Sequence, residues 1–182
     1  MQEVLAQLSW YHVVTLMDKV KERPVLLCLF GQPLSYECGW RGFLHKMYGN
    51  VIIPQAVFDE VTVKDDSACH TIKALDWINV RRIASQDDRR MYKAKLHAGE
   101  VDVMILAQEL GADVLTVIDD NAARKTARYL GIKVTGTVGV LMKAKKLGYI
   151  DSVKKCIAMM RRAGFYVGTE LERVALDKVG EA

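Results

Sequence analysis

Short apolar runs alternate along the chain with longer segments in which apolar residues recur every three or four positions. The runs have the length of buried strands, and the longer segments have the period of amphipathic helices. The predicted strands cover residues 51–54, 80–83, 114–118 and 132–134. The predicted helices cover residues 55–63, 71–79, 98–110, 121–130 and 138–147. Because strands and helices alternate in this way, the sequence predicts an α/β fold around a parallel sheet.

Two further helices are predicted near the C-terminus, over residues 151–163 and 170–179. They form a helical C-terminal appendix, residues 151–182, to the α/β part. The chain contains three prolines and no low-complexity segment, clear repeat or Pro/Gly/Ser-rich linker. Its 182 residues are enough for one domain with a sizeable core. We therefore expect residues 1–182 to form a single domain.

The composition is that of an ordinary globular protein, with 51% hydrophobic and 26% charged residues. No apolar stretch approaches the roughly 18 residues that are needed to span a bilayer. The sequence starts Met-Gln-Glu and lacks the basic region of a secretory signal, so we expect a cytoplasmic protein with no membrane partner. The four cysteines show no C-x-x-C pair and the four histidines are scattered, which gives a structural zinc site little support.

The net charge is +4, and many basic residues occur in clusters. Examples are Arg81-Arg82, Arg89-Arg90, Arg124-Lys125 and Arg161-Arg162. Such clusters suit a polyanionic partner, but they also occur on solvated helix faces that bind nothing. Charge alone therefore leaves both interpretations open.

The run Leu115-Thr-Val-Ile-Asp-Asp120 is the most informative local pattern, because a predicted strand ends there in two adjacent carboxylates. Open α/β sheets place their active sites at the carboxyl ends of strands. Adjacent like charges raise one another's pKa, and a shared cation or proton relieves the repulsion. An aspartate that caps the following helix would also explain the pattern.

Other acids can reach the same edge of the sheet. Glu100 lies in the first turn of the helix over 98–110, and helix starts meet strand ends at one edge of a parallel sheet. Glu60 lies on the helix after the first predicted strand, where an exposed acid with no function is the alternative. Asp102 splays from Glu100 by roughly 200° on a helix, so it is a reserve candidate only. Carboxylates without nearby Cys or His favour Mg²⁺ or Mn²⁺.

Four motifs follow one another at ordered spacing from about residue 47 to the C-terminus. They are Val51-Ile-Ile-Pro54 with Glu60, His97-Ala-Gly-Glu100-Val-Asp102, Ile118-Asp-Asp120, and Gly136-Thr-Val-Gly139. Together they resemble the PIN-domain nuclease superfamily, and especially its VapC-like branch of predicted nucleic-acid-binding proteins. The resemblance implies a PIN-like fold, with a central parallel sheet flanked by helices.

The resemblance also implies a site in which about four acids hold Mg²⁺ or Mn²⁺ and hydrolyse RNA or other phosphodiesters. Glu60 matches the second acid of the family, Glu100 the third, and Asp119 with Asp120 the fourth position. These four residues are the candidate metal ligands and catalytic residues. The nearest basic residues that could hold phosphates follow on the next helix: Arg124, Lys125 and Arg128.

Residues 1–46 depart from the family pattern, which places its first acid at the end of the opening strand. One alignment uses the segment Phe30-Gly-Gln-Pro33-Leu34 and puts Phe30 where an aspartate belongs. A second alignment takes residues 12–18 as the opening strand, so that Asp18 supplies the first acid. Both alignments stay open.

The sequence therefore predicts a divalent-metal ribonuclease of toxin or RNA-processing type, with activity weakened if the first acid is absent. The alternative is a PIN-like module that binds nucleic acid or protein without cutting. The expected partners are RNA, a small antitoxin protein and a second copy of the chain.

Overall fold

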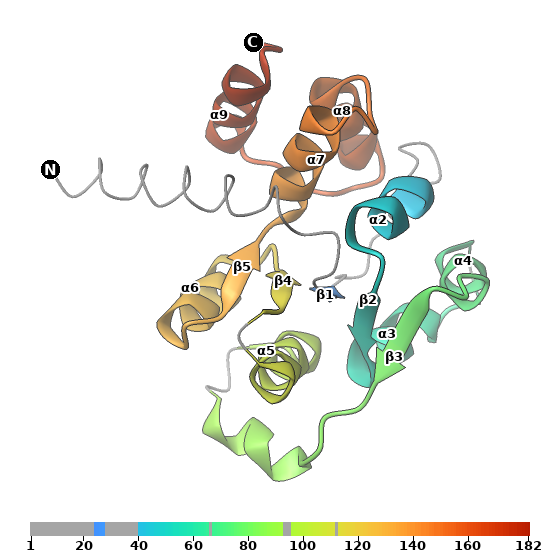
Figure 1. The fold of residues 1–182 in the computed structure, drawn as a ribbon, viewed down its shortest axis with the longest axis vertical. Coiled ribbons are helices and arrows are strands. Elements are labelled where there is room, and N and C mark those ends of the chain that lie inside the picture. Colours follow the sequence, from blue (N-terminus) through green and yellow to red (C-terminus); the bar gives the residue numbers. More distant parts are fainter. Residues whose placement is uncertain (1–23, 28–39, 66, 93–95, 112) are drawn as a thin grey trace, which may run out of the picture.

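The computed structural model describes residues 24–27, 40–65, 67–92, 96–111 and 113–182. Its centre is a parallel sheet with the strand order β3-β2-β1-β4-β5 (Figure 1). The strands are β1 (Val25–Leu27), β2 (Val51–Pro54), β3 (Ile78–Arg81), β4 (Leu115–Val117) and β5 (Lys133–Thr135). The central strands are apolar because both faces of the sheet are covered, as is usual for parallel sheets.

Helices pack against both faces of this sheet (Figure 1). They are α2 (Trp40–Tyr48), α3 (Gln55–Thr62), α4 (Ser67–Lys73), α5 (Ala98–Leu110), α6 (Asn121–Tyr129), α7 (Thr137–Lys146), α8 (Val153–Arg162) and α9 (Thr169–Val179), with a short 3₁₀ helix η3 (Gln86–Met91) before α5. Successive residues of a strand point to opposite faces, so Val51 and Ile53 join the core under α2 and α7. Ile52 joins the second core, under α5 and α6. The predicted α/β fold with a flanked parallel sheet is confirmed.

One predicted element is wrong. The sequence predicted a single helix over residues 71–79, but helix α4 ends at Lys73 and strand β3 already begins at Ile78. Strand β3 pairs with β2 along its whole length, from Ile78 opposite Val51 to Arg81 opposite Pro54. These ladder hydrogen bonds override the local helical period, which a short apolar segment specifies only weakly. No helix among the described residues is long and apolar enough to cross a membrane.

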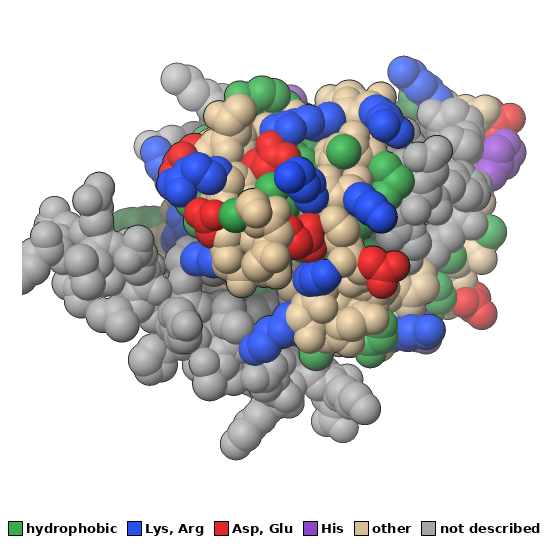
Figure 2. Space-filling model, turned by 90° about the horizontal axis from the view of Figure 1, so that it is seen from above, with side chains coloured by type: hydrophobic (Ala, Val, Ile, Leu, Met, Phe, Trp, Pro, Cys, Tyr) green, Lys and Arg blue, Asp and Glu red, His purple; other side chains and the backbone are tan. Residues whose placement is uncertain are grey.

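The C-terminal helices α8 and α9 pack against α7 (Figure 1). They contribute Ile157, Met160 and Leu176 to the same core as Val25 of the central strand. On their outer face, shown in Figure 2, Lys and Arg side chains alternate with Asp and Glu. Arg161 of α8 pairs with Glu172 of α9 at 2.6 Å. The predicted helical appendix is therefore joined to the sheet through a continuous core.

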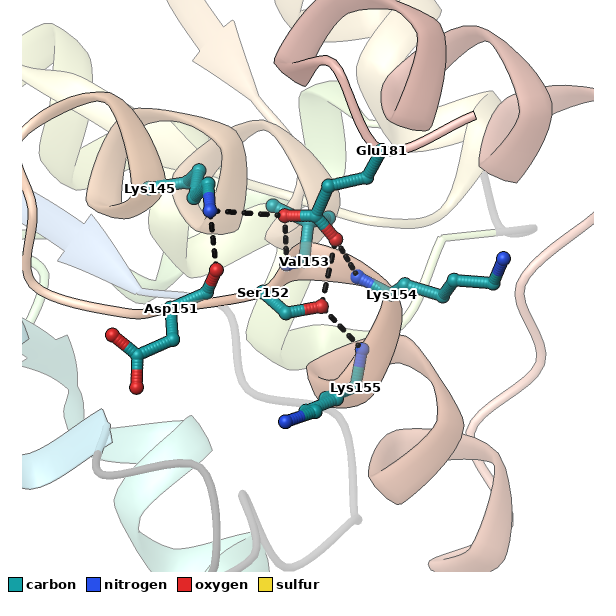
Figure 3. Close-up of polar contacts among 7 residues, drawn as sticks. All are labelled: Lys145, Asp151, Ser152, Val153, Lys154, Lys155 and Glu181. Atoms are coloured by element: carbon teal, nitrogen blue, oxygen red, sulfur yellow. Dashed lines mark hydrogen bonds and ion pairs between the residues drawn. The ribbon is translucent and has the colours of Figure 1, made fainter.

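Glu181 ties the end of α9 to the start of α8 (Figure 3). Its carboxylate accepts hydrogen bonds from the backbone N–H groups of Val153 and Lys154, both at 2.9 Å, and from the Ser152 hydroxyl at 2.7 Å. Lys145 of α7 lies 3.5 Å away. Burial acts to raise the pKa of Glu181, but these donors and the Lys145 charge outweigh it and lower the pKa to about 2. The carboxylate thus occupies the positive end of α8.

We predict that Glu181→Gln destabilises the protein by about 1–2 kcal/mol at pH 7, because charge-assisted bonds become neutral ones. Since the folded pKa is lowered, the stabilisation is present above the ordinary glutamate pKa of 4.5 and is lost as the pH falls toward about 2. Urea unfolding at pH 7 and pH 3 measures both effects. Glu170→Gln, which removes an exposed pair with Arg173, is the matched control and should change stability much less. An equal loss of stability in both variants would contradict a stabilising role of the Glu181 contacts with the start of α8.

Candidate active site

Asp119 follows strand β4 and is fixed to the start of α7. Its Oδ1 accepts a hydrogen bond from the backbone N–H of Thr137 at 2.8 Å, and its Oδ2 accepts one from the Thr137 hydroxyl at 2.5 Å. A Cβ atom added at Gly136 would lie 2.9 Å from Oδ1 of Asp119, so a side chain at this position would displace the Asp119 carboxylate from Thr137. Thr137 was not identified as a site residue from the sequence. The Gly136-Thr137 turn that opens a helix was the signal that could have found it.

Asp120 forms the N-cap of α6. Its Oδ1 accepts a hydrogen bond from the backbone N–H of Ala123 at 2.8 Å. The simple interpretation of an aspartate as a helix cap is therefore correct for Asp120. The cap uses one carboxylate oxygen and leaves the side chain exposed at the edge of the sheet.

Glu100 is a buried carboxylate, with only 1% of its surface exposed. It belongs to a capping box with His97, in which its Oε2 accepts a hydrogen bond from the backbone N–H of His97 at 3.0 Å. Its Oε1 is buried and has no hydrogen-bond partner within the described ranges. Burial raises the pKa of Glu100; the His97 N–H bond lowers it, and the negative charges of Asp120 and Glu60 raise it further.

Glu60 is exposed on α3, next to the start of α5. Helix α3 approaches α5 closely because residue 99 has no side chain: a Cβ atom at Gly99 would lie 2.8 Å from Val57 and 3.8 Å from Oε2 of Glu60. The structure therefore brings Glu60 and Asp120 near enough to Glu100 to act on its charge. Asp119, adjacent in sequence to Asp120, lies at the same edge of the sheet.

These residues can be compared with the needs of a divalent cation. The donors are carboxylate oxygens, the ligand type that Mg²⁺ and Mn²⁺ prefer. A buried acceptor without a partner, Oε1 of Glu100, is a group that a cation would satisfy. Among the described residues, no three acidic, histidine or cysteine side chains lie close enough together to hold a metal ion. The donor chemistry fits the cation, while the described side chains are not drawn together around one point.

Asp102, the reserve ligand, is directed to a different partner. Its two oxygens accept hydrogen bonds from Nε and Nη2 of Arg89, both at 2.6 Å. The Asp102 side chain is 3% exposed and that of Arg89 35% exposed. The bidentate pair fixes η3 against α5 and makes Asp102 a structural anchor. No local pattern connects residues 89 and 102, so sequence reasoning missed this contact.

The three basic candidates lie on α6, which leads away from the aspartate pair. Arg124 is half-buried, and its Nη1 lies 3.4 Å from the position of a Cβ atom at Gly136, beside Asp119. Burial and the charge of Arg128 lower the pKa of Arg124, and the charge of Asp119 opposes them. Its Nε is buried without a hydrogen-bond partner in the part of the chain that the structure describes. Lys125 and Arg128 are exposed.

Both candidates for the first acidic position, Asp18 and the residue-30 position, lie outside the described residues. The strand between β2 and β4 is Val25–Leu27, which belongs to the apolar run that ends at Phe30. Neither alignment is therefore decided by the described residues.

Taken together, these features define an α/β domain with carboxylates gathered where the strands end and the helices begin. A family model described as a PIN domain matches residues 37–181, so the chain belongs to the PIN-domain family. This is a nuclease-type fold, and PIN domains generally bind nucleic acid and depend on divalent metal ions. No curated protein matches the sequence.

We predict that Arg89→Met destabilises the protein by about 2–3 kcal/mol, because it leaves the buried Asp102 carboxylate without its partner. Adding Asp102→Asn should recover part of the loss. Denaturant unfolding of both variants measures this, with Lys133→Met as the control because its pair with Asp113 is exposed and worth about 0–1 kcal/mol. Equal losses for Arg89→Met and Lys133→Met would show that the buried pair has no special role.

We also predict that Glu100→Gln gains stability relative to the native protein as the pH rises. The folded pKa of Glu100 is raised, so the native protein loses stability as the pH increases through 4.5 and the buried carboxyl is forced to ionise. Thermal unfolding of both proteins without metal, from pH 4 to pH 7, measures the difference. If the native protein instead became more stable relative to the variant as the pH rose from 4 to 7, burial of the Glu100 carboxylate would not be unfavourable.

Proposed function

We propose that this protein is a divalent-metal-dependent endoribonuclease of the PIN/VapC type. The observation that carries the proposal is the buried Oε1 of Glu100, which has no partner among the described residues and lies under the negative charges of Asp120 and Glu60. An unpaired buried carboxylate beside other carboxylates is costly, and a cation would remove that cost. The ends of parallel strands are also where open α/β sheets place their active sites.

In this proposal Glu60, Glu100, Asp119 and Asp120 hold the cation. When bound, Mg²⁺ or Mn²⁺ supplies Lewis-acid chemistry for the hydrolysis of an RNA phosphodiester. The chain itself supplies the orientation: Thr137 fixes Asp119, the capping box fixes Glu100, and the start of α6 fixes Asp120. Gly99 keeps α3 close enough for Glu60 to take part.

The basic residues of α6 complete the proposed site by holding phosphates of the RNA. Arg124 is half-buried beside Asp119, and its Nη1 lies 3.4 Å from the position of a Cβ atom at Gly136, so its guanidinium would offer positive charge to a phosphate at the acidic site. Lys125 and Arg128 extend positive charge along the same helix. Binding of this kind is independent of sequence and weakens as the salt concentration rises.

The second candidate function is a PIN-like module that binds nucleic acid or a protein partner, such as a small antitoxin or another copy of the chain, without cutting RNA. The alignment that puts Phe30 where the family has an acid would favour it. Loss of one ligand weakens the hold on a cation more than it changes the surrounding fold.

We expect the native protein to cut RNA in Mg²⁺ or Mn²⁺ but not in EDTA. Asp119→Asn with Asp120→Asn should lower the rate on the order of 100-fold or more, because ligands and their orientation are lost together. Gel analysis of a mixed RNA panel measures cleavage. The matched control is Asp87→Asn with Asp88→Asn, an adjacent and exposed acidic pair on η3 that should leave the rate unchanged.

Equal cleavage by the native protein and the Asp119/Asp120 variant would mean that the activity does not come from this site. Metal binding has a separate readout, since Mn²⁺ should raise the Tm of the native protein and should raise that of Glu100→Gln much less. No cleavage together with no Mn²⁺-dependent change in Tm would support the binding module.

A further inference from the structure

The exposed side of α6 carries Lys125, Arg128 and Tyr129, with Arg124 half-buried at its margin; we call it the α6 basic face. The opposite side of the helix is small and apolar, and its Ala123 and Ala127 are fully buried in the core. The helix therefore lies flat on the domain and presents its long polar side chains outward.

The positive charges of the α6 basic face are not neutralised within the part of the chain that the structure describes. Lys125 and Arg128 form no hydrogen bond or ion pair with a described side chain, whereas Arg124 at the margin feels the negative charge of Asp119. The C-terminal helices differ, because their Lys and Arg side chains are interspersed with acids (Figure 2). There Arg173, for example, pairs with both Glu170 and Asp177. Of these two basic surfaces, α6 is the one whose exposed positive charges are not paired with acids, so it is the surface better suited to bind a polyanion.

Tyr129 adds a different chemistry to this face. Its surface is 90% exposed, at the end of α6. Lys125 lies one turn before it on the same side of the helix, since residues four apart are neighbours on an α-helix. Tyr129 is nine residues from Asp120, which corresponds to about 13 Å along the helix. An aromatic ring and a positive charge thus lie together on one side of α6, and Arg128 adds a second positive charge beside them. Because each residue turns an α-helix by about 100°, Tyr129 lies on roughly the opposite side of α6 from Asp120.

We propose that Tyr129 stacks on a base of single-stranded RNA whose neighbouring phosphates bind Lys125 and Arg128. Phosphates supply charge, and an exposed ring face supplies the sequence-tolerant stacking that single-stranded nucleic-acid sites use. A duplex keeps its base faces inside the stack, so a ring in this position discriminates against it. This inference rests on the proposed RNA-binding function and specifies the form of its substrate.

The test measures binding separately from cleavage, with fluorescence anisotropy of a labelled single-stranded RNA in EDTA. Tyr129→Ala should weaken binding on the order of tenfold, and Tyr129→Phe should restore it because the ring is kept. The matched control is Tyr166→Ala, which removes a tyrosine of 88% exposure outside α6 and should bind like the native protein. Arg128→Ala should reduce the salt dependence of binding by about one phosphate contact, whereas Tyr129→Ala should leave that dependence unchanged.

Three results would overturn the inference: equal affinity of Tyr129→Ala and Tyr166→Ala, an equal loss for duplex and single-stranded RNA, or a change from dimer to monomer in gel filtration of Tyr129→Ala. The last result would make the α6 basic face an interface between copies of the chain.

Failure of the stacking proposal is distinguishable from failure of the proposed nuclease. RNA cleavage that depends on Asp119 and Asp120, without an effect of Tyr129→Ala on binding, would refute the stacking alone. Binding that depends on Tyr129 without any cleavage would support the stacking and refute the nuclease.

Discussion

The concentration of carboxylates at one edge of the sheet is the interaction on which the rest of the site depends, because like charges at short range repel one another. The fold places each of three acids against the start of a helix: Glu100 at α5, Asp120 at α6 and Asp119 at α7. A helix start offers free N–H groups and a partial positive charge. The parallel sheet makes this possible, since its strands end where its helices begin.

This arrangement limits what the same carboxylates can give to a cation. Both oxygens of Asp119 bind Thr137, and one oxygen each of Asp120 and Glu100 is used in a cap. The remaining oxygen of Glu100 is buried and has no hydrogen-bond partner among the described residues. Much of the unfavourable free energy of burying these carboxylates is therefore concentrated at this oxygen. The free oxygen of Glu100 would therefore favour binding of a cation, but it destabilises the fold when no cation is bound. We therefore expect the metal-free native protein to be less stable than a variant with a neutral side chain at position 100.

Sequence reasoning predicted the parts of this structure that local patterns encode. The parallel α/β fold, the strand before Asp119 and the helix starts at Glu100 and Asp120 follow from apolar periodicity and capping chemistry. Contacts between distant residues were not predictable in the same way. The Arg89–Asp102 pair depends on where η3 packs, and the helix over 71–79 was wrong because pairing of β3 with β2 decides that segment. The sequence shows which residues can act as acids, bases or caps, but tertiary packing decides which residues they contact.

The charge distribution around α6 connects the acidic site to its proposed substrate. An RNA phosphate approaching Glu100, Asp119 and Asp120 meets a negative potential, which opposes binding unless a cation compensates for it. Arg124 lies at the boundary, since it feels both the negative charge of Asp119 and the positive charge of Arg128. Beyond it, positive charge continues along the exposed side of the helix. In the proposed function, the backbone of an RNA would be held along α6 while one phosphodiester reached the carboxylates, and a cation held by Glu60, Glu100, Asp119 and Asp120 would lower the electrostatic repulsion there.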